Sequence, residues 1–214
     1  MLKIEHTSVT GFEAAIRGVR NPFNSWHLSD SVPGDGGCEV IIGEKDLSLM
    51  HRLRNAGTDH RKYMRMICVW CDITAPRFWW PEFDAYKVGT VANSCSTMHT
   101  IHKRDLTLDD FSHEHLKGNA ARALENLITV INDFRAEYIA NGKKEDWRSI
   151  IELLPQSYNQ KRTVLMNYEV LANMYKSRKG HRLDEWKTLL DWIETLPYSE
   201  LITNGKACEQ EREG

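Results

Sequence analysis

The sequence predicts a single domain that mixes strands and helices, the α+β class. Three observations support this prediction. First, 214 residues, of which 41% are hydrophobic and 27% charged, are enough to close one core but short for two. Second and third, strand-like apolar runs lie in the first third of the chain, and runs with helical spacing dominate its second half. We therefore expect one domain over residues 1–200 and a polar tail over 201–214.

Three segments are predicted to be strands. Residues 1–9 alternate moderately between apolar and polar side chains, and residues 38–42 form a short apolar run. Residues 64–73 are rich in Met, Ile, Val, Trp and Cys, which is typical of a well-buried strand. The polar segment 21–37 contains prolines and glycines and is long for a loop in a compact domain. It is therefore a candidate lid or ligand loop.

Helical spacing marks the remaining elements. The clearest example is 119–140, where apolar side chains recur every three or four residues and Asn141-Gly142 then ends the pattern. Pro81 fits the first turn of a short helix. The other predicted helices are 11–20, 45–55, 145–154, a long helix from Pro155 to about Ser177, and 183–195.

Composition and charge exclude several classes of protein. The 28 Lys and Arg residues are balanced by 30 Asp and Glu residues, so a nucleic acid is not expected as the main partner. No run approaches the roughly 20 apolar residues that a membrane span needs. The first residues are typical of a strand rather than of a signal peptide. We therefore expect a cytoplasmic protein.

Five cysteines form an odd and scattered set, Cys38, Cys68, Cys71, Cys95 and Cys208. Such a set predicts reduced thiols rather than a disulfide framework. The spacing Cys68-x-x-Cys71 is half of a redox or zinc motif. A strand, however, places residues three apart on opposite faces, and no second pair follows. Both are therefore predicted to be core cysteines.

Two further clusters allow a functional and a structural interpretation. His113 and His115 flank Glu114, but two histidines without further spaced ligands favour a solvated loop, and no metal site is predicted. The pair Trp79 and Trp80 could stack on a flat ring such as a flavin or a base. Core packing is the simpler explanation for such an aromatic cluster.

The second half of the chain carries a spacing that resembles one enzyme family. Leu154-Pro155 is followed by Asn167, Leu171 and Arg178. This order is similar to the Leu-Pro…Asn…Leu…Arg pattern of the flavin-dependent thymidylate synthases (ThyX). Trp186 resembles the tryptophan of that family's closing helix, one residue late. The resemblance covers nearly the whole chain and implies a ThyX-like fold with a central, mainly antiparallel sheet and long packed helices.

The family's signature, Arg-His-Arg-x-x-Ser-x-Asn-Glu-x-Ser-x-Arg, is matched in layout by residues 85–98 with one inserted residue. Four positions keep the expected character: Lys87, Thr90, Asn93 and Ser96. The arginines of the signature, which would grip a phosphate or a pyrimidine carbonyl through paired hydrogen bonds, are lost. The residues in their place are Ala85, Tyr86 and Met98. Other cations lie near the motif and could replace them: Arg77, Lys87, Lys103 and Arg104.

The resemblance also implies a reaction and a set of ligands. In the family, reduced FAD relays a one-carbon unit from methylenetetrahydrofolate to C5 of dUMP, which yields dTMP, and NADPH reduces the flavin again. The cofactor carries the difficult chemistry, and the protein binds and orients the reactants. The family's active sites are shared between subunits, so a homotetramer is implied.

Position by position, the resemblance assigns roles to eight residues. Arg178 would be the catalytic residue, because its counterpart holds the pyrimidine and polarises it toward attack at C5. The implied substrate-binding residues are Glu82, Ser96 and Arg178. The implied cofactor-binding residues are His60, Lys87, Thr90, Asn93 and Asn167. The structural alternative for Arg178 is a contact with a carboxylate at the end of its helix, where a cation is favourable.

Two departures from the family pattern add negative charge near a site built for phosphate. Glu82 stands where the family has a glutamine, and Glu169 stands where an arginine often follows the asparagine. Cys95 lies inside the altered signature, but the family's chemistry uses no cysteine there.

These departures leave two alternatives to a flavin-dependent enzyme. One is a non-catalytic nucleotide-binding protein that has kept the fold and lost FAD chemistry. The other is a structural or interaction protein whose pocket is filled by Trp79, Trp80 or Tyr86.

Overall fold

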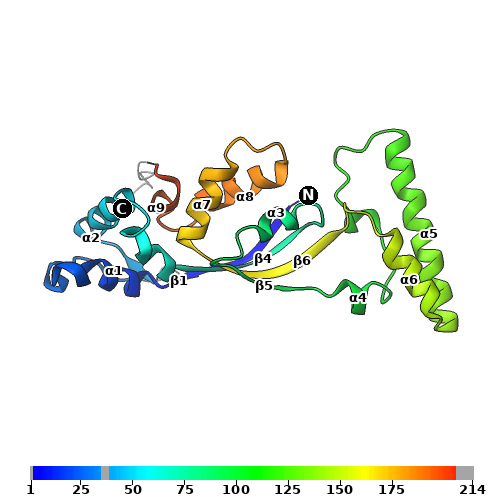
Figure 1. Ribbon diagram of the computed structural model, residues 1–214, viewed down its shortest axis with the longest axis horizontal. Helices are drawn as coiled ribbons and strands as arrows, with labels where there is room; N and C mark the ends of the chain where they lie inside the picture. Colours follow the sequence, from blue (N-terminus) through cyan, green and yellow to red (C-terminus); the bar gives the residue numbers. More distant parts are fainter. Residues whose placement is uncertain (1, 35–38, 206–214) are drawn as a thin grey trace. The chain divides into compact units, whose positions relative to one another are not determined.

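The computed structural model describes residues 2–34 and 39–205 of the chain (Figure 1). Four strands form one sheet in the order β1-β4-β6-β5, and two short strands pair as an antiparallel ribbon. The sheet strands are β1 (Lys3–Thr10), β4 (Cys68–Pro76), β5 (Val91–Ser94) and β6 (Asn159–Asn167), and the ribbon strands are β2 (Val32–Pro33) and β3 (Val40–Ile41).

Nine α-helices occur in the described residues: α1 (Phe12–Arg20), α2 (Glu44–Asn55), α3 (Trp80–Asp84), α4 (Thr97–Thr100), α5 (Asn119–Asn141), α6 (Lys144–Leu153), α7 (Tyr168–Arg178), α8 (Asp184–Glu194) and α9 (Glu200–Thr203). Short 3-10 helices are η1 (Asn21–Phe23), η2 (Trp26–Leu28), η3 (Arg61–Met66) and η4 (Leu108–Asp110). The mixture of a sheet with long helices confirms the predicted α+β class. No helix in the described ranges is both long and apolar enough to cross a membrane.

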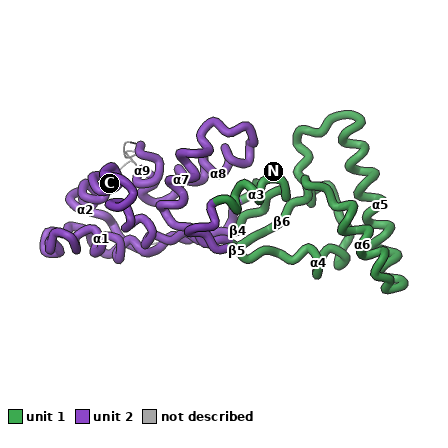
Figure 2. The backbone as a smooth tube through the Cα atoms, viewed as in Figure 1, with its two compact units in different colours: residues 1–3, 72–85, 92–163 green, residues 4–71, 86–91, 164–214 purple. Residues whose placement is uncertain are grey.

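Internal contacts divide the chain into two compact units (Figure 2). Unit 1 comprises Met1–Lys3, Asp72–Ala85 and Ala92–Thr163, and unit 2 comprises Ile4–Cys71, Tyr86–Val91 and Val164–Gly214. The single domain over residues 1–200 stays a prediction.

In unit 1, α5 and α6 pack against each other around an apolar core. The predicted stripe of α5 supplies Leu124, Ile128 and Ile131, and Ile150 of α6 is fully buried against them. Gly142 ends α5 with a φ of +68°, and its backbone N–H donates to the carbonyl of Tyr138 at 2.8 Å. Both predicted helices and the predicted stop are therefore confirmed.

An aromatic cluster fills the interior beside α3. Trp79 and Trp80 are 0% and 1% exposed, with ring centroids 5.0 Å apart, and Phe83 lies 5.2 and 5.4 Å from them. Pro81 occupies the first turn of α3, as predicted. The core interpretation of the two tryptophans is confirmed, because both side chains are almost completely buried.

In unit 2, a buried carboxylate ties the described part of the segment 21–43 to α2. Asp46 accepts hydrogen bonds from Arg20 Nε at 2.7 Å, Ser29 Oγ at 2.6 Å and Ser31 Oγ at 2.7 Å. Burial alone raises the pKa of Asp46, but the hydrogen bonds from Ser29, Ser31 and Arg20 outweigh burial and hold the pKa below its ordinary value. The predicted lid loop is therefore anchored over its described residues.

One predicted element is wrong, and a second is displaced along the chain. The long helix expected from Pro155 to about Ser177 is a strand, β6, followed by α7, which begins only at Tyr168. Asn167 has an extended backbone with a φ of −132°, and its Oδ1 accepts from the N–H of Val170 at 3.0 Å, so it caps α7 rather than lying within it. The strand predicted over 64–73 begins at Cys68, because Arg61–Met66 forms η3 instead.

Candidate functional site

The residues that the sequence assigns to a site fall into both units. Unit 1 holds Glu82, Asn93 and Ser96, and unit 2 holds His60, Lys87, Thr90, Asn167 and Arg178. Each group is built up within its own unit.

In unit 2, Arg178 ends α7 against an aromatic side chain. Its guanidinium carbon lies 4.3 Å from the ring centroid of Trp186, which is fully buried in α8. Its Nε donates to the hydroxyl of Tyr86 at 3.0 Å, and its Nη1 lies 3.3 Å from Nε2 of His181. A guanidinium over an indole face is held by charge and by stacking together. The plane of Arg178 is therefore fixed by its own unit.

Tyr86 replaces part of the family's signature and lies against this same arginine. The guanidinium carbon of Arg178 is 5.5 Å from the centroid of the Tyr86 ring, and the rings of Tyr86 and Trp186 are 6.1 Å apart, edge to face. The rings of Tyr86 and Trp186 thus both contact Arg178. The resemblance implies that a pyrimidine base binds beside Arg178, and the ring of Tyr86 already lies beside the same arginine.

The segment 86–91 approaches the start of α7. Gly89 has a φ of +100°, and a Cβ added there would lie 3.3 Å from Nδ2 of Asn167. Thr90 Oγ1 donates to the carbonyl of Tyr86 at 3.3 Å, while Lys87 is exposed. The structure therefore brings Asn167 close to the segment that carries Lys87 and Thr90. His60 precedes η3 and is exposed. Its side chain forms no hydrogen bond with Lys87, Thr90 or Asn167.

Glu169 forms an internal ion pair. Its carboxylate, 9% exposed, accepts from Nε and Nη2 of Arg65 and lies 3.5 Å from Nε of Arg61. The negative charge that Glu169 adds is therefore matched by two cations of its own unit.

In unit 1, a cavity of about 540 Å³ opens beside α3 and β6. Successive side chains of a strand point to opposite faces, so Gln160 and Arg162 reach the cavity while Lys161 and Thr163 contact Asp72 on the other side, at 2.9 and 2.6 Å. The full lining is Arg77, Trp80, Pro81, Asp84, Ser94, Cys95, Ser96, Thr97, Met98, Ile151, Gln156, Gln160 and Arg162.

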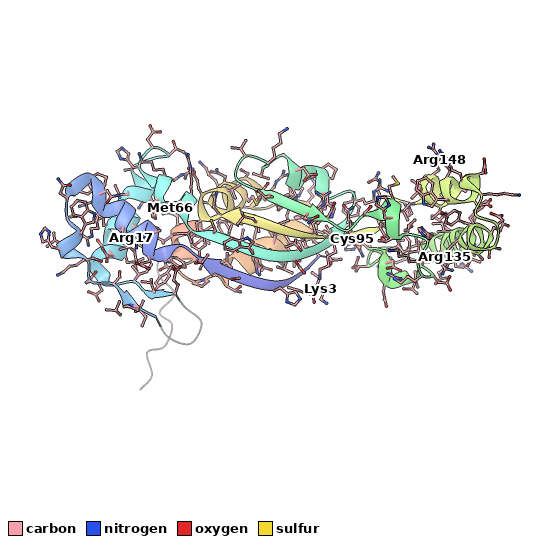
Figure 3. The ribbon with its side chains drawn as sticks, turned by 90° about the horizontal axis from the view of Figure 1, so that it is seen from below. Lys3, Arg17, Met66, Cys95, Arg135 and Arg148 are labelled. Atoms are coloured by element: carbon pink, nitrogen blue, oxygen red, sulfur yellow. The ribbon has the colours of Figure 1, made fainter. Side chains whose placement is uncertain are left out.

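Only one predicted site residue of unit 1 lines this cavity. Ser96 lies at its edge and caps α4, where its Oγ accepts from the N–H of His99 at 3.3 Å. Asn93 is exposed on β5, and Glu82 is half-buried in α3, and neither belongs to the lining. Cys95 lines the cavity next to Ser96, and its Sγ lies 3.8 Å from Oγ1 of Thr100 (Figure 3).

The sequence interpretation missed Asp84, Gln160 and Arg162. Residues 159–167 were predicted to be helical, and a helix does not place residues two apart on one face. The side chains over 159–163 are all polar and those over 164–166 are all apolar, so the sequence of β6 carries no two-residue alternation that could have revealed the strand.

The remaining candidates are structural in the described residues. Cys71 is buried and Cys68 is half-buried, and burial raises the pKa of the Cys68 thiol, which disfavours the reactive thiolate. Cys38 and Cys208 lie outside the described residues. His113 donates to or accepts from its own loop, with Nδ1 2.9 Å from the carbonyl oxygen of Phe111. Within 2–34 and 39–205, no three His, Cys, Asp or Glu side chains gather where they could hold a metal ion.

Comparison with known proteins identifies the fold. No protein-family model matches the sequence, and no curated protein matches it either. Among solved structures, ThyX from Helicobacter pylori complexed with FAD and dUMP superposes with a TM-score of 0.69 at 16% identity, over 94% of this chain and 97% of that one. A second H. pylori ThyX structure with FAD and dUMP gives 0.68 at 15% identity, over 95% and 97%.

A third solved structure extends the comparison. The UMP/dUMP methylase PolB from Streptomyces cacaoi, bound with 5-Br dUMP, has a TM-score of 0.54 at 13% identity, over 82% of this chain and 76% of that one. The fold is therefore that of the flavin-dependent thymidylate synthases. The sequence resemblance implies the same fold, and at 13–16% identity the similarity extends to the fold alone.

Proposed function

We propose that this chain binds a pyrimidine nucleotide similar to dUMP and transfers a one-carbon unit to C5 of its base. The observation that carries the proposal is Arg178, which keeps its family position and is fixed by the indole of Trp186 at 4.3 Å. A guanidinium with a fixed plane can offer paired hydrogen bonds to a pyrimidine carbonyl. Such bonds orient the base and draw electron density from the ring, which favours reaction at C5.

The cofactor implied by this reaction is FAD, and the donor set of unit 2 fits it. Lys87 is an exposed cation that can pair with a pyrophosphate, and Asn167 keeps its Nδ2 beside Gly89, where any side chain would crowd it at 3.3 Å. His60 and Thr90 are the other proposed contacts in unit 2, and the resemblance also implies a cofactor contact for Asn93, which belongs to unit 1. When bound, the reduced flavin would relay the one-carbon unit from methylenetetrahydrofolate, with NADPH as the reductant.

The rest of the proposal concerns what the chain's own residues do. Arg178 would orient the base, Ser96 would contact the nucleotide, and Glu82 would lie on the substrate side, as the resemblance implies. We place the protein in the cytoplasm as a homotetramer, because the family's active sites are shared between subunits.

A non-catalytic nucleotide-binding protein is the second candidate. The observation that favours it is the hydrogen bond from Arg178 Nε to the Tyr86 hydroxyl, which engages one of the donors that a base would need. The loss of the signature arginines at Ala85 and Met98 points in the same direction, because FAD chemistry in the family depends on them.

A release assay tests the proposed activity. The purified protein is incubated with FAD, NADPH, methylenetetrahydrofolate and dUMP that carries tritium at C5. Transfer of a carbon to C5 replaces that hydrogen, so tritium should appear in water, and omission of FAD should abolish it. A folded protein that binds dUMP but releases no tritium under these conditions would support the second candidate instead.

A further inference from the structure

We propose that the cavity of unit 1 binds the phosphate of a phosphomonoester, with Arg77 and Arg162 as its cationic partners. Neither residue occupies a position of the family's signature, so the two would replace the arginines that the signature has lost. The phosphate chemistry follows from the cavity alone. Only the identity of the ester as the 5′-phosphate of a pyrimidine nucleotide rests on the proposed function.

Arg162 is held in place before any ligand arrives. Its guanidinium carbon lies 4.0 Å from the ring centroid of Trp80, and the indole Nε1 of Trp80 is itself fixed by the carbonyls of Ala75 at 3.1 Å and Gln160 at 3.2 Å. The Arg162 side chain is only 17% exposed. A planar cation held by stacking loses little freedom when it binds an anion.

Part of the hydrogen-bonding capacity of Arg162 remains for a ligand. Its Nε donates to Oε1 of Gln160 at 3.2 Å and its Nη1 to Oδ1 of Asp84 at 2.9 Å. Its Nη2 donates to no atom of the described residues. The exposed carboxylate of Asp84 orients the guanidinium and also competes with an incoming anion, so its removal should strengthen phosphate binding.

Arg77 supplies the second charge. It directly follows β4, and its backbone N–H is anchored to the carbonyl of Tyr158 at 2.9 Å. Arg77 belongs to the lining of the cavity, and its guanidinium forms no ion pair with any described residue. With Arg162 and Asp84, the lining carries two cations against one carboxylate, so it has a net positive charge that favours an anion.

The remaining walls fit an ester rather than a bare ion. Three lining residues, Ser94, Ser96 and Thr97, carry hydroxyl groups that can donate to phosphate oxygens, whereas Met98 and Ile151 are apolar. The volume of about 540 Å³ lies within the range of small-molecule pockets. A phosphate with an attached sugar or nucleoside would use both kinds of wall.

Calorimetric titration of the purified full-length chain tests this site. The ligands are dUMP, 2-deoxyribose 5-phosphate and, as the ligand without phosphate, uridine. Arg77→Gln should weaken binding of both phosphate esters about 10-fold or more and leave any uridine binding unchanged. Asp84→Asn should tighten both by about 3-fold, because it removes the competing carboxylate.

The matched control is Arg148→Gln. Arg148 lies at the outer edge of α6 in the same unit, and its side chain is 61% exposed and paired with Glu152 (Figure 3). Arg148 does not belong to the cavity lining, and its charge is paired with Glu152, so the affinities of this variant should match those of the unchanged chain. The thermal transition of each variant shows that it is folded.

The outcomes separate this site from the proposed function. If dUMP binds and neither Arg77→Gln nor Asp84→Asn changes its affinity, the phosphate site is refuted while the proposed function stands. If 2-deoxyribose 5-phosphate binds in an Arg77-dependent way and dUMP does not, the site is supported and the proposed function fails. If the folded chain binds neither ester, the phosphate site is overturned.

Discussion

Each unit holds one arginine stacked on a buried tryptophan. In unit 1, Arg162 lies 4.0 Å from the ring centroid of Trp80, and in unit 2, Arg178 lies 4.3 Å from that of Trp186. Both tryptophans are at most 1% exposed. The stacking interaction has the same effect in both units, because a rigid indole fixes the plane of a guanidinium and weakens its contact with water.

The two arginines differ in the side chain that accepts their hydrogen bond. Arg162 pairs with the carboxylate of Asp84 and faces a cavity, whereas Arg178 donates to the hydroxyl of Tyr86. The carboxylate of Asp84 balances the positive charge of Arg162. The hydroxyl of Tyr86 accepts a hydrogen bond from Arg178 but carries no charge. The comparison indicates that stacking on tryptophan determines the orientation of each guanidinium. The side chain that accepts its hydrogen bond determines what else the guanidinium can bind. We assign a phosphate to Arg162 and a pyrimidine base to Arg178.

The largest effect is expected for Arg178→Lys. Lysine keeps the charge but loses the fork and the planar contact with Trp186, so affinity for dUMP and tritium release should fall about 100-fold. Calorimetric titration and the release assay measure the two quantities. Arg182→Lys, an exposed position shortly after α7, is the control and should leave both unchanged. An unchanged affinity in Arg178→Lys would break the assignment of the base to unit 2.

The next effect concerns stability and sharpens the role of α7. Glu169→Gln removes the buried carboxylate that pairs with Arg65 and Arg61, which should lower the free energy of unfolding by about 2 kcal/mol. Urea unfolding followed by circular dichroism measures it. The exposed Glu152→Gln, which breaks only the surface pair with Arg148, should cost less than about 0.5 kcal/mol.

The same Glu169 variant separates structure from binding. Because Glu169 is matched within unit 2, its removal should leave the affinity of the folded protein for dUMP nearly unchanged. A loss of affinity for dUMP without a loss of stability would show that the ion pair of Glu169 with Arg65 and Arg61 belongs to the ligand site.

A smaller effect is expected for Arg162→Lys. The ammonium group keeps the charge and loses both the stack on Trp80 and the paired donors, so 2-deoxyribose 5-phosphate should bind about 10-fold more weakly. Titration with this ligand measures the change. If lysine serves as well as arginine, the stack in unit 1 has no part in binding, and the parallel between the two units is lost.

The smallest effect is expected for Tyr86→Phe. The ring stays and the hydroxyl is removed, so Nε of Arg178 loses an acceptor and becomes available to a pyrimidine carbonyl. Affinity for dUMP should rise about 3-fold. A fall in affinity would mean instead that the hydroxyl itself contacts the nucleotide, so the sign of the change identifies its role.

The sequence predicted the elements that depend on local pattern. The helix over 119–140 has a long apolar stripe and a glycine stop, and both are local properties that tertiary structure did not override. The ThyX-like fold was predicted from the spacing between Leu154-Pro155, Asn167 and Arg178. That spacing survived although β6, rather than a helix, connects its first two members.

The parts that could not be predicted depend on contacts between distant residues. β6 has its neighbours in β4 and β5, so its strand character comes from pairing rather than from its own sequence. The ion pair between Arg65 and Glu169 could not be predicted, because 104 residues separate the two in the sequence. The contact of Tyr86 with Arg178, 92 residues away, appears only when both are placed in space.

The central claim, that this ThyX-fold chain is a flavin-dependent enzyme acting on a pyrimidine nucleotide, is tested most directly by one spectrum. The purified protein is incubated with FAD, passed through gel filtration, and its visible absorption is recorded before and after addition of dUMP. We predict a retained flavin band that changes when dUMP is added. A protein that emerges folded and without flavin would contradict the claim.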